Sequence, residues 1–214
     1  MQSCITMTII GFFAGSLMFS YFIPKWFLGI DIRENTEDGN PGSTNAIKSA
    51  GVHIGLLCMF LDILKAFIPI YISINYLNIS GLYLVPIIAA PSAGHAFSPF
   101  MGFKGGKAVS TLYGSLLGIL GISRAVFFIA ALMVLFKTLI VIKPDSAMVT
   151  VSLISANAAV LYYEPLYEVK IAVTLICLIV SYKILKNPNK GDIVVSIWNL
   201  HIIFDEGKVK VRHI

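Results

Sequence analysis

The stretch GHAFSPFMGFKGGKAVST, residues 94–111, contains one histidine, two lysines and four glycines but no carboxylate. Lys104 and Lys107 flank the pair Gly105 and Gly106, and a lysine ammonium is a point charge suited to phosphate oxygens. His95 can act as a general base near neutral pH. The stretch therefore predicts a site for a phosphate-like anion with His95 as candidate base. The alternative is that both lysines mark a membrane edge and His95 is a structural residue.

A second glycine-rich loop, DIRENTEDGNPGSTNAIKSAG, covers residues 31–51. Its glycines permit positive φ angles and let backbone amides converge on an anion at the start of a helix. Polar side chains beside these glycines add hydrogen-bond donors, namely Asn40, Ser43, Thr44 and Asn45. The loop predicts a second part of a phosphate site, although an ordinary polar turn between two helices would have the same composition.

Other polar residues lie within apolar stretches. Ser152 and Ser155 are three apart in VSLIS and share a helical face, where serines usually pack or bond backbone carbonyls. Asp62 and Lys65 are also three apart, and we expect a structural ion pair. Asn187 ends the last apolar segment and is either a helix cap or a site residue.

The elements that must position these residues are membrane helices. Of the 214 residues, 57% are hydrophobic and 13% are charged, and the mean hydropathy is +0.84, which a soluble domain would not show. A bilayer core of ~30 Å needs roughly 20 apolar residues per helix. The sequence predicts an all-α, polytopic membrane protein of about seven transmembrane helices in one bundle, near residues 4–24, 52–75, 79–93, 108–122, 125–142, 147–163 and 168–186.

The basic residues predict the orientation of the bundle. Arg124 and Lys170 fall on one side, whereas most other basic residues, including those of both glycine-rich loops, fall on the other. The positive-inside rule then places the N-terminus outside and both loops and the C-terminus in the cytoplasm. We expect residues 1–190 to form the transmembrane domain, with a retained first helix, and residues 191–214 to form a short polar tail whose alternation favours a hairpin or a surface strand.

The composition also limits the partners and cofactors. The net charge of +5 comes without the basic clusters that nucleic-acid binding would need. Cys4, Cys58 and Cys177 are scattered in apolar runs, so neither disulfides nor a metal site is expected.

Five stretches occur in an order that resembles one family. They are DIRENTEDGNPGSTNAIKSAG, LDILKA, GHAFSPFMGFKGGKAVST, VSLIS and YKILKN. The sequence is similar, over roughly residues 8–190, to the bacterial membrane glycerol-3-phosphate acyltransferase family that uses acyl phosphate, and GFKGGK is the most specific piece. The resemblance implies seven helices in the bacterial inner membrane with the active site facing the cytoplasm. It also implies acyl transfer from acyl phosphate to glycerol 3-phosphate in phospholipid synthesis, giving lysophosphatidic acid and phosphate without a metal or coenzyme A.

The resemblance also assigns roles to residues. It implies that His95, Asp38, Ser152 and Ser155 are catalytic. It implies that the substrate phosphate is bound by Asn40, Gly42, Thr44, Asn45, Lys48, Lys104, Gly105, Gly106, Lys107 and Asn187.

Two positions depart from the family pattern. Asp38 stands where the family has a serine, and a carboxylate there would repel the substrate unless paired with Lys48 or Lys104. Ile184 replaces a histidine and cannot donate a hydrogen bond. The leading hypothesis is an acyltransferase that acts on these two substrates in a lipid bilayer. The alternatives are a catalytically silent relative that binds a phosphorylated ligand and, less favoured, an anion transporter.

Overall fold

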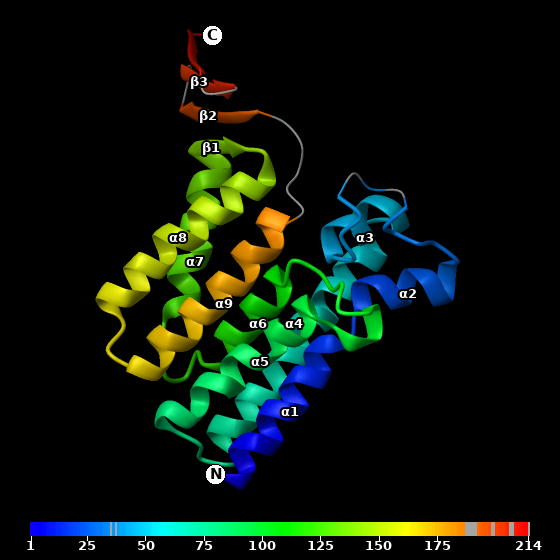
Figure 1. The fold of residues 1–214 in the computed structure, drawn as a ribbon, viewed down its shortest axis with the longest axis vertical. Helices are drawn as coiled ribbons and strands as arrows, with labels where there is room; N and C mark the ends of the chain where they lie inside the picture. The colour runs from blue at the N-terminus through cyan, green and yellow to red at the C-terminus, as the bar shows by residue number, and fades with distance from the viewer. Residues whose placement is uncertain (35, 37, 187–191, 198–199, 206–207, 214) are drawn as a thin grey trace.

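The computed structural model describes residues 1–34, 36, 38–186, 192–197, 200–205 and 208–213. It shows a bundle of helices with a small sheet at one end (Figure 1). The helices of the bundle are α1 (Gln2–Ser16), α4 (Val52–Asn75), α5 (Leu84–Ala96), α6 (Val109–Gly118), α7 (Ala125–Thr138), α8 (Asp145–Tyr163) and α9 (Tyr167–Lys186). The helices α2 (Phe19–Leu28) and α3 (Ser43–Ala50) lie beside the bundle, and Gly81–Tyr83 and Pro99–Met101 form two short 3-10 turns, η1 and η2.

Each of the seven predicted segments contains a helix, but the fifth was drawn too long, because residues 140–142 belong to a β-strand. The prediction for 52–75 coincides with α4, and the first segment is divided into α1 and α2, which meet at 43°. Among the described residues, three helical stretches are long and apolar enough to cross a bilayer, Val52–Asn75, Gly81–Met101 and Asp145–Tyr163; α1 and α2 would make a fourth if they form one span. The prediction of seven spans therefore stays a prediction, because α6 and α7 have only 10 and 14 residues and α9 carries charges at both ends.

Glycines let the bundle helices approach closely. A Cβ atom on Gly15 of α1 would overlap the backbone of Pro91 in α5, and one on Gly114 of α6 would overlap the Ile63 carbonyl in α4. Gly118 lies against Ile70, about two turns further along α4. The glycines at 11 and 15 and at 114 and 118, each four residues apart, therefore form small-residue packing faces.

The helix α3 was not predicted. Its eight residues begin directly after the glycines of the first loop and end at Gly51, whose φ of 89° only glycine adopts readily. A Cβ atom on Gly55 would overlap Ile47, so α3 folds back onto the first turn of α4. The segment is too short and too polar to signal a membrane helix, which is why the scan for apolar length passed over it.

The sheet corrects the prediction of an all-helical fold. Its antiparallel strands follow the order β1 (Ile140–Lys143), β2 (Ile193–Ile197), β3 (Leu200–Asp205) and β4 (Lys208–His213). The predicted tail thus forms strands that pair with the connection between α7 and α8, where Ile140 faces Ile197. Alternating β-branched residues favour extended backbone, and the exposed edge at β1 accepts the tail.

Candidate active site

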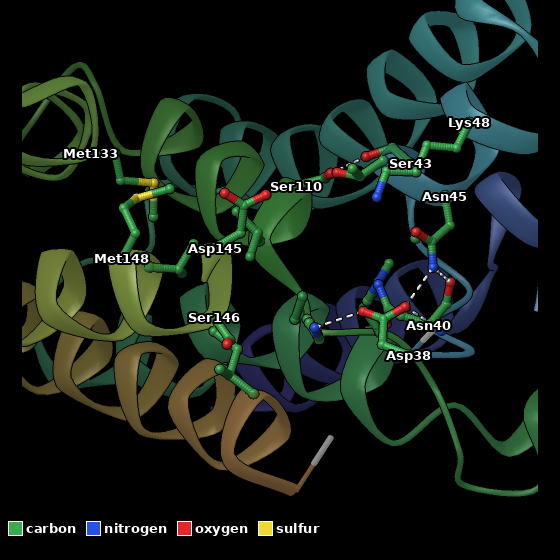
Figure 2. Close-up of a pocket in the computed structure, with 18 of the residues that line it drawn as sticks. Asp38, Asn40, Ser43, Asn45, Lys48, Ser110, Met133, Asp145, Ser146 and Met148 are labelled. Carbon is green, nitrogen blue, oxygen red and sulfur yellow. Dashed lines mark hydrogen bonds and ion pairs between the residues drawn. The ribbon is translucent and has the colours of Figure 1, made fainter. Parts of the chain in front are cut away.

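The two glycine-rich loops meet at one cavity. The cavity has a volume of about 300 Å³ and is lined from α3, α5, α6, α7, α8 and α9, from the loop before α3 and from the loop before α6. In Figure 2, Ser43, Asn45 and Lys48 lie across the cavity from Ser146 and Met148. The prediction that the two loops lie on the same side of the bundle is confirmed.

Three helices begin at this cavity. The first residues of α3 (Ser43 and Thr44), α6 (Val109 and Ser110) and α8 (Asp145) all line it. No described side chain caps any of these three N-termini. The first N–H groups of a helix lack partners within the helix, and they carry the positive end of its dipole. The cavity is therefore suited to hold an anion.

An ion pair joins the two loops inside the cavity. The Asp38 carboxylate lies 2.8 Å from the Lys107 ammonium, and the side chains of these two residues are only 9% and 14% exposed. The prediction that Asp38 would need a cationic partner is confirmed, but the predicted partners, Lys48 and Lys104, are wrong. Lys107 is the partner because the second loop folds over the first, a contact that no sequence spacing specifies.

Hydrogen bonds fix Asp38 in the first loop. The Asn45 side chain donates to Asp38 Oδ1 at 2.8 Å, and the Asn40 backbone N–H donates to the same oxygen at 3.2 Å. Burial raises the pKa of Asp38, but the ion pair with Lys107 and these hydrogen bonds outweigh it, so the pKa lies below its usual value of 3.8. Asp38 is therefore ionised at neutral pH. Gly39, at φ 54°, makes the turn that follows.

Two further lysines contribute charge to the cavity. Lys137 of α7 pairs with Asp145 at 2.6 Å, and both side chains are more than half exposed. Lys48 of α3 lines the cavity and forms no ion pair with a described residue. Lys48 thus offers its charge to a ligand without first breaking such a contact.

His95, at the end of α5, also lines the cavity. Its side chain is buried, with 3% exposure, and Nδ1 lies 3.0 Å from the ammonium of Lys65. A Cβ atom on Gly106 would lie 2.5 Å from His95 Nε2, and one on Gly105 would overlap the His95 carbonyl. Neither glycine has a positive φ. The pair is therefore glycine so that the second loop can lie directly against His95, rather than to allow an unusual turn.

The predicted site residues divide into three groups. The cavity is lined by His95, Asp38, Asn40, Gly42, Thr44, Asn45, Lys48 and Lys107. It is not lined by Lys104, Gly105, Gly106, Ser152 or Ser155. Asn187 lies outside the described residues.

The residues away from the cavity have other surroundings. Ser152 donates a hydrogen bond of 2.7 Å to the Met148 carbonyl one turn earlier in α8. Gly105 and Gly106 support His95 from behind, and Lys104 is exposed. The roles predicted for Ser152 and Ser155 therefore stay predictions.

The sequence did not predict the apolar wall of the cavity. Met133 of α7 and Met148 of α8 lie on the side opposite Lys48, and Val149 of α8 and Ile184 of α9 also line the cavity. Figure 2 shows both methionines on the same side, far from Asn45. One cavity thus combines a polar, cationic side with an apolar side, as a ligand with a charged head and a hydrocarbon chain would require.

The sequence profile described as "Glycerol-3-phosphate acyltransferase" matches residues 5–191. The chain belongs to this family. Family members with similar sequences include Glycerol-3-phosphate acyltransferase 2 of Thermotoga maritima, 46% identical over 106 residues, which cover 50% of this chain and 53% of that protein. Another is the glycerol-3-phosphate acyltransferase of Acholeplasma laidlawii, 40% identical over 136 residues and 58% of each chain. The chain thus spans about half the length of these relatives.

Solved structures extend the family likeness over more of the fold. The crystal structure of PlsY (YgiH), an integral membrane glycerol 3-phosphate acyltransferase, in its glycerol 3-phosphate form matches with a TM-score of 0.75 and 28% identity. The match covers 86% of this chain and 90% of that chain. The lysophosphatidic acid form of PlsY matches with a TM-score of 0.74 and 27% identity.

Proposed function

We propose that this protein transfers an acyl group from acyl phosphate to the 1-hydroxyl of sn-glycerol 3-phosphate. The products are lysophosphatidic acid and inorganic phosphate, and the reaction serves membrane phospholipid synthesis. The observation that carries the proposal is the cavity in which three uncapped helix N-termini meet Lys48 and Lys107 beside an apolar wall. The family and the two substrate-named forms of PlsY support it.

The geometry suggests how each substrate binds. The phosphate of glycerol 3-phosphate accepts hydrogen bonds at the start of α3 and contacts Lys48, while Asn45 keeps the loop in place. The acyl chain lies along the wall of Met133 and Met148, which adapts to flexible hydrocarbon. The acyl phosphate group then meets the start of α6 beside Lys107.

The reaction needs no covalent intermediate on the protein. The glycerol hydroxyl oxygen bonds to the acyl carbonyl carbon, and the bond from that carbon to the phosphate oxygen breaks. Phosphate leaves with the electron pair, and the hydroxyl proton ends on the released hydrogen phosphate. Holding both substrates in one cavity makes this step effectively unimolecular, and oriented N–H groups stabilise the developing negative charge. No metal ion or coenzyme A takes part in this scheme.

The decisive experiment supplies purified protein with palmitoyl phosphate and labelled glycerol 3-phosphate, in the presence of EDTA. We expect phosphate release and labelled lysophosphatidic acid in equal amounts. Loss of a charged hydrogen bond of about 2 kcal/mol should raise KM for glycerol 3-phosphate about 30-fold in Lys48→Met. The matched control Lys143→Met removes an exposed lysine of β1 that does not line the cavity. Release no greater than that of His95→Ala would contradict the proposal.

A second candidate is a silent relative that binds a phosphorylated ligand. It is favoured because Asp38 forms an ion pair with Lys107, and because the Ile184 side chain, which lines the cavity, cannot donate a hydrogen bond. Binding of glycerol 3-phosphate without product formation would support this candidate. Transport is less favoured because Asp62 and Lys65, the charged residues within α4, are buried and paired at 2.6 Å. Counterflow in proteoliposomes would detect it.

A further inference from the structure

Lys65 is surrounded by three acceptors in the interior of the bundle. Its ammonium forms an ion pair of 2.6 Å with Asp62 Oδ1 and donates a hydrogen bond to the Leu17 carbonyl. Its third neighbour is His95 Nδ1, at 3.0 Å. Ser20 donates to the other oxygen of Asp62, so this carboxylate has partners on both oxygens.

These contacts determine which partner donates the bond to His95. An ammonium can donate hydrogen bonds but cannot accept them. In the contact of 3.0 Å between Lys65 and His95, Nδ1 is therefore the acceptor. A neutral imidazole that accepts at Nδ1 carries its proton on Nε2. No described residue is hydrogen-bonded to Nε2, and His95 is one of the residues that line the cavity.

The arrangement also disfavours a second proton on the ring. An imidazolium would turn an N–H at Nδ1 toward the Lys65 ammonium. The other charged groups near the ring include Lys183, which is buried and lies 5.7 Å from the centre of the Phe97 ring. Asp62 is already paired with Lys65 and does not contact the imidazole. To accept a proton at Nε2, the neutral ring would first have to carry its own proton on Nδ1. That proton would replace the hydrogen bond from Lys65, so His95 cannot act as a base at Nε2 while this bond exists.

We propose that Lys65 is a positioning residue that fixes His95 in the Nε2-protonated tautomer. His95 then donates a hydrogen bond to an anionic oxygen of the substrate and does not act as the general base. The identity of that oxygen, in a phosphate or at the acyl carbonyl, rests on the proposed function, whereas the tautomer itself does not. The Asp62–Lys65 pair gains a role in this arrangement, because without Asp62 the Lys65 ammonium would be buried with no counter-charge.

The test is a nitrogen NMR spectrum of protein labelled with ¹⁵N-histidine in detergent micelles. The chain has four histidines, and the spectrum of His95→Gln identifies the signals of His95 by their absence. We expect a protonated Nε2 and an unprotonated, hydrogen-bonded Nδ1 between about pH 6 and pH 8, the range in which an ordinary imidazole titrates. A protonated Nδ1, in either the other tautomer or the imidazolium, would overturn the proposal.

A variant tests whether Lys65 is the cause. Asp62→Asn combined with Lys65→Met removes the donor to Nδ1 while leaving the interior uncharged, so that the fold is kept. The Nδ1 signal should then shift and the two tautomers should mix, whereas Lys143→Met should leave both signals unchanged. Unchanged His95 signals in the double variant would refute the role of Lys65. If the spectra agree but wild-type protein forms no lysophosphatidic acid, the proposed reaction fails and the tautomer stands.

Kinetics then separate a donor from a base. His95→Ala should lower kcat about 100-fold, as loss of one donor to a developing anion does. His95→Gln keeps an N–H donor but cannot take up a proton, so its kcat should be at least about tenfold above that of His95→Ala. Equal kcat values for the two variants would contradict the donor role.

Discussion

Asp38 gives the cavity an anion of its own. It is buried against Lys107 and accepts hydrogen bonds from Asn45 and from the Asn40 N–H. The carboxylate thus links the two loops when no substrate is present, and it also neutralises a cation that a substrate phosphate would otherwise meet. The first effect should favour substrate binding and the second should weaken it, and one variant of Asp38 separates the two.

Asp38→Asn keeps an acceptor oxygen for Asn45 and Asn40 but removes the charge that pairs with Lys107. We expect KM for glycerol 3-phosphate to fall about fivefold, which corresponds to about 1 kcal/mol for one ion pair of limited exposure. Because the pKa of Asp38 is lowered, the carboxylate stays ionised at neutral pH, and the effect should be the same at pH 6 and pH 8. Steady-state kinetics at both values measure it.

The control for this variant is Asp31→Asn. Asp31 pairs with Arg33 at 2.8 Å and with Lys25 at 3.2 Å, and it does not line the cavity. An unchanged or raised KM in Asp38→Asn, with Asp31→Asn normal, would show that the link between the loops matters more than the repulsion of the substrate phosphate by Asp38.

Individual contacts were predictable only where the partners are close in sequence. Asp62 and Lys65 lie one helical turn apart, and their ion pair is confirmed. The contact between Lys65 and His95 joins residues 30 positions apart, and that between Asp38 and Lys107 joins residues 69 apart. The departure of Asp38 from the family pattern indicated that it needs a cation, but only the packing of the two loops selects Lys107 among the nearby lysines.

The second loop and α5 form one packed unit. The Gly106 N–H donates to the His95 carbonyl at 3.1 Å, and both loop glycines lack room for a side chain. The motif KGGK therefore combines a cation for the cavity with a surface flat enough to support the imidazole. This dual role explains why two glycines precede Lys107 even though neither glycine lines the cavity.

Gly106→Ala places a methyl group 2.5 Å from His95 Nε2 and should push the ring from its position. We expect kcat to fall about 100-fold, because small displacements of reacting groups reduce rates by that order. Gly121→Ala is the matched control, since its Cβ would meet nothing within 4 Å and its φ is not positive. Comparable kcat values for the two variants, measured by phosphate release, would show that the imidazole needs no support from the loop.

The helices of the bundle were predictable, but α3 and the sheet were less so. Apolar length identified α4, α8 and α9 nearly to the residue, because a helix in lipid must satisfy all its backbone groups internally. The eight residues of α3 carry no such signal, although their N-terminus supplies part of the cavity. Alternation in the tail indicated strands, but their pairing with β1 depends on contacts between distant segments.

The bundle as a whole has two ends, and the cavity lies at one of them. Lys104 is exposed in the loop beside the cavity, while Tyr162 is 79% exposed at the opposite end of α8. The distribution of basic residues predicts that the cavity end faces the cytoplasm. Lys104→Cys and Tyr162→Cys, each in a chain whose three native cysteines are replaced by serine, test this prediction.

A maleimide that cannot cross membranes should label Tyr162→Cys on intact cells and Lys104→Cys only after the cells are permeabilised. The parent chain without cysteine gives the background. Labelling of both variants from outside would contradict the assignment of α8 as a span, and the reverse pattern would contradict the orientation.

The short helix α6 sets the depth at which the chemistry occurs. Gly114 lies beside Ile63 and Gly118 beside Ile70, so α6 begins next to the interior of α4, roughly 10 Å below the residue at which α4 starts. If α4 spans the bilayer from its first residue, as the sequence predicts, the start of α6 lies below the membrane surface. In the proposed reaction, a donor whose tail stays in the bilayer would then reach the cavity without leaving the lipid, and the small hydrophilic acceptor would enter from the water.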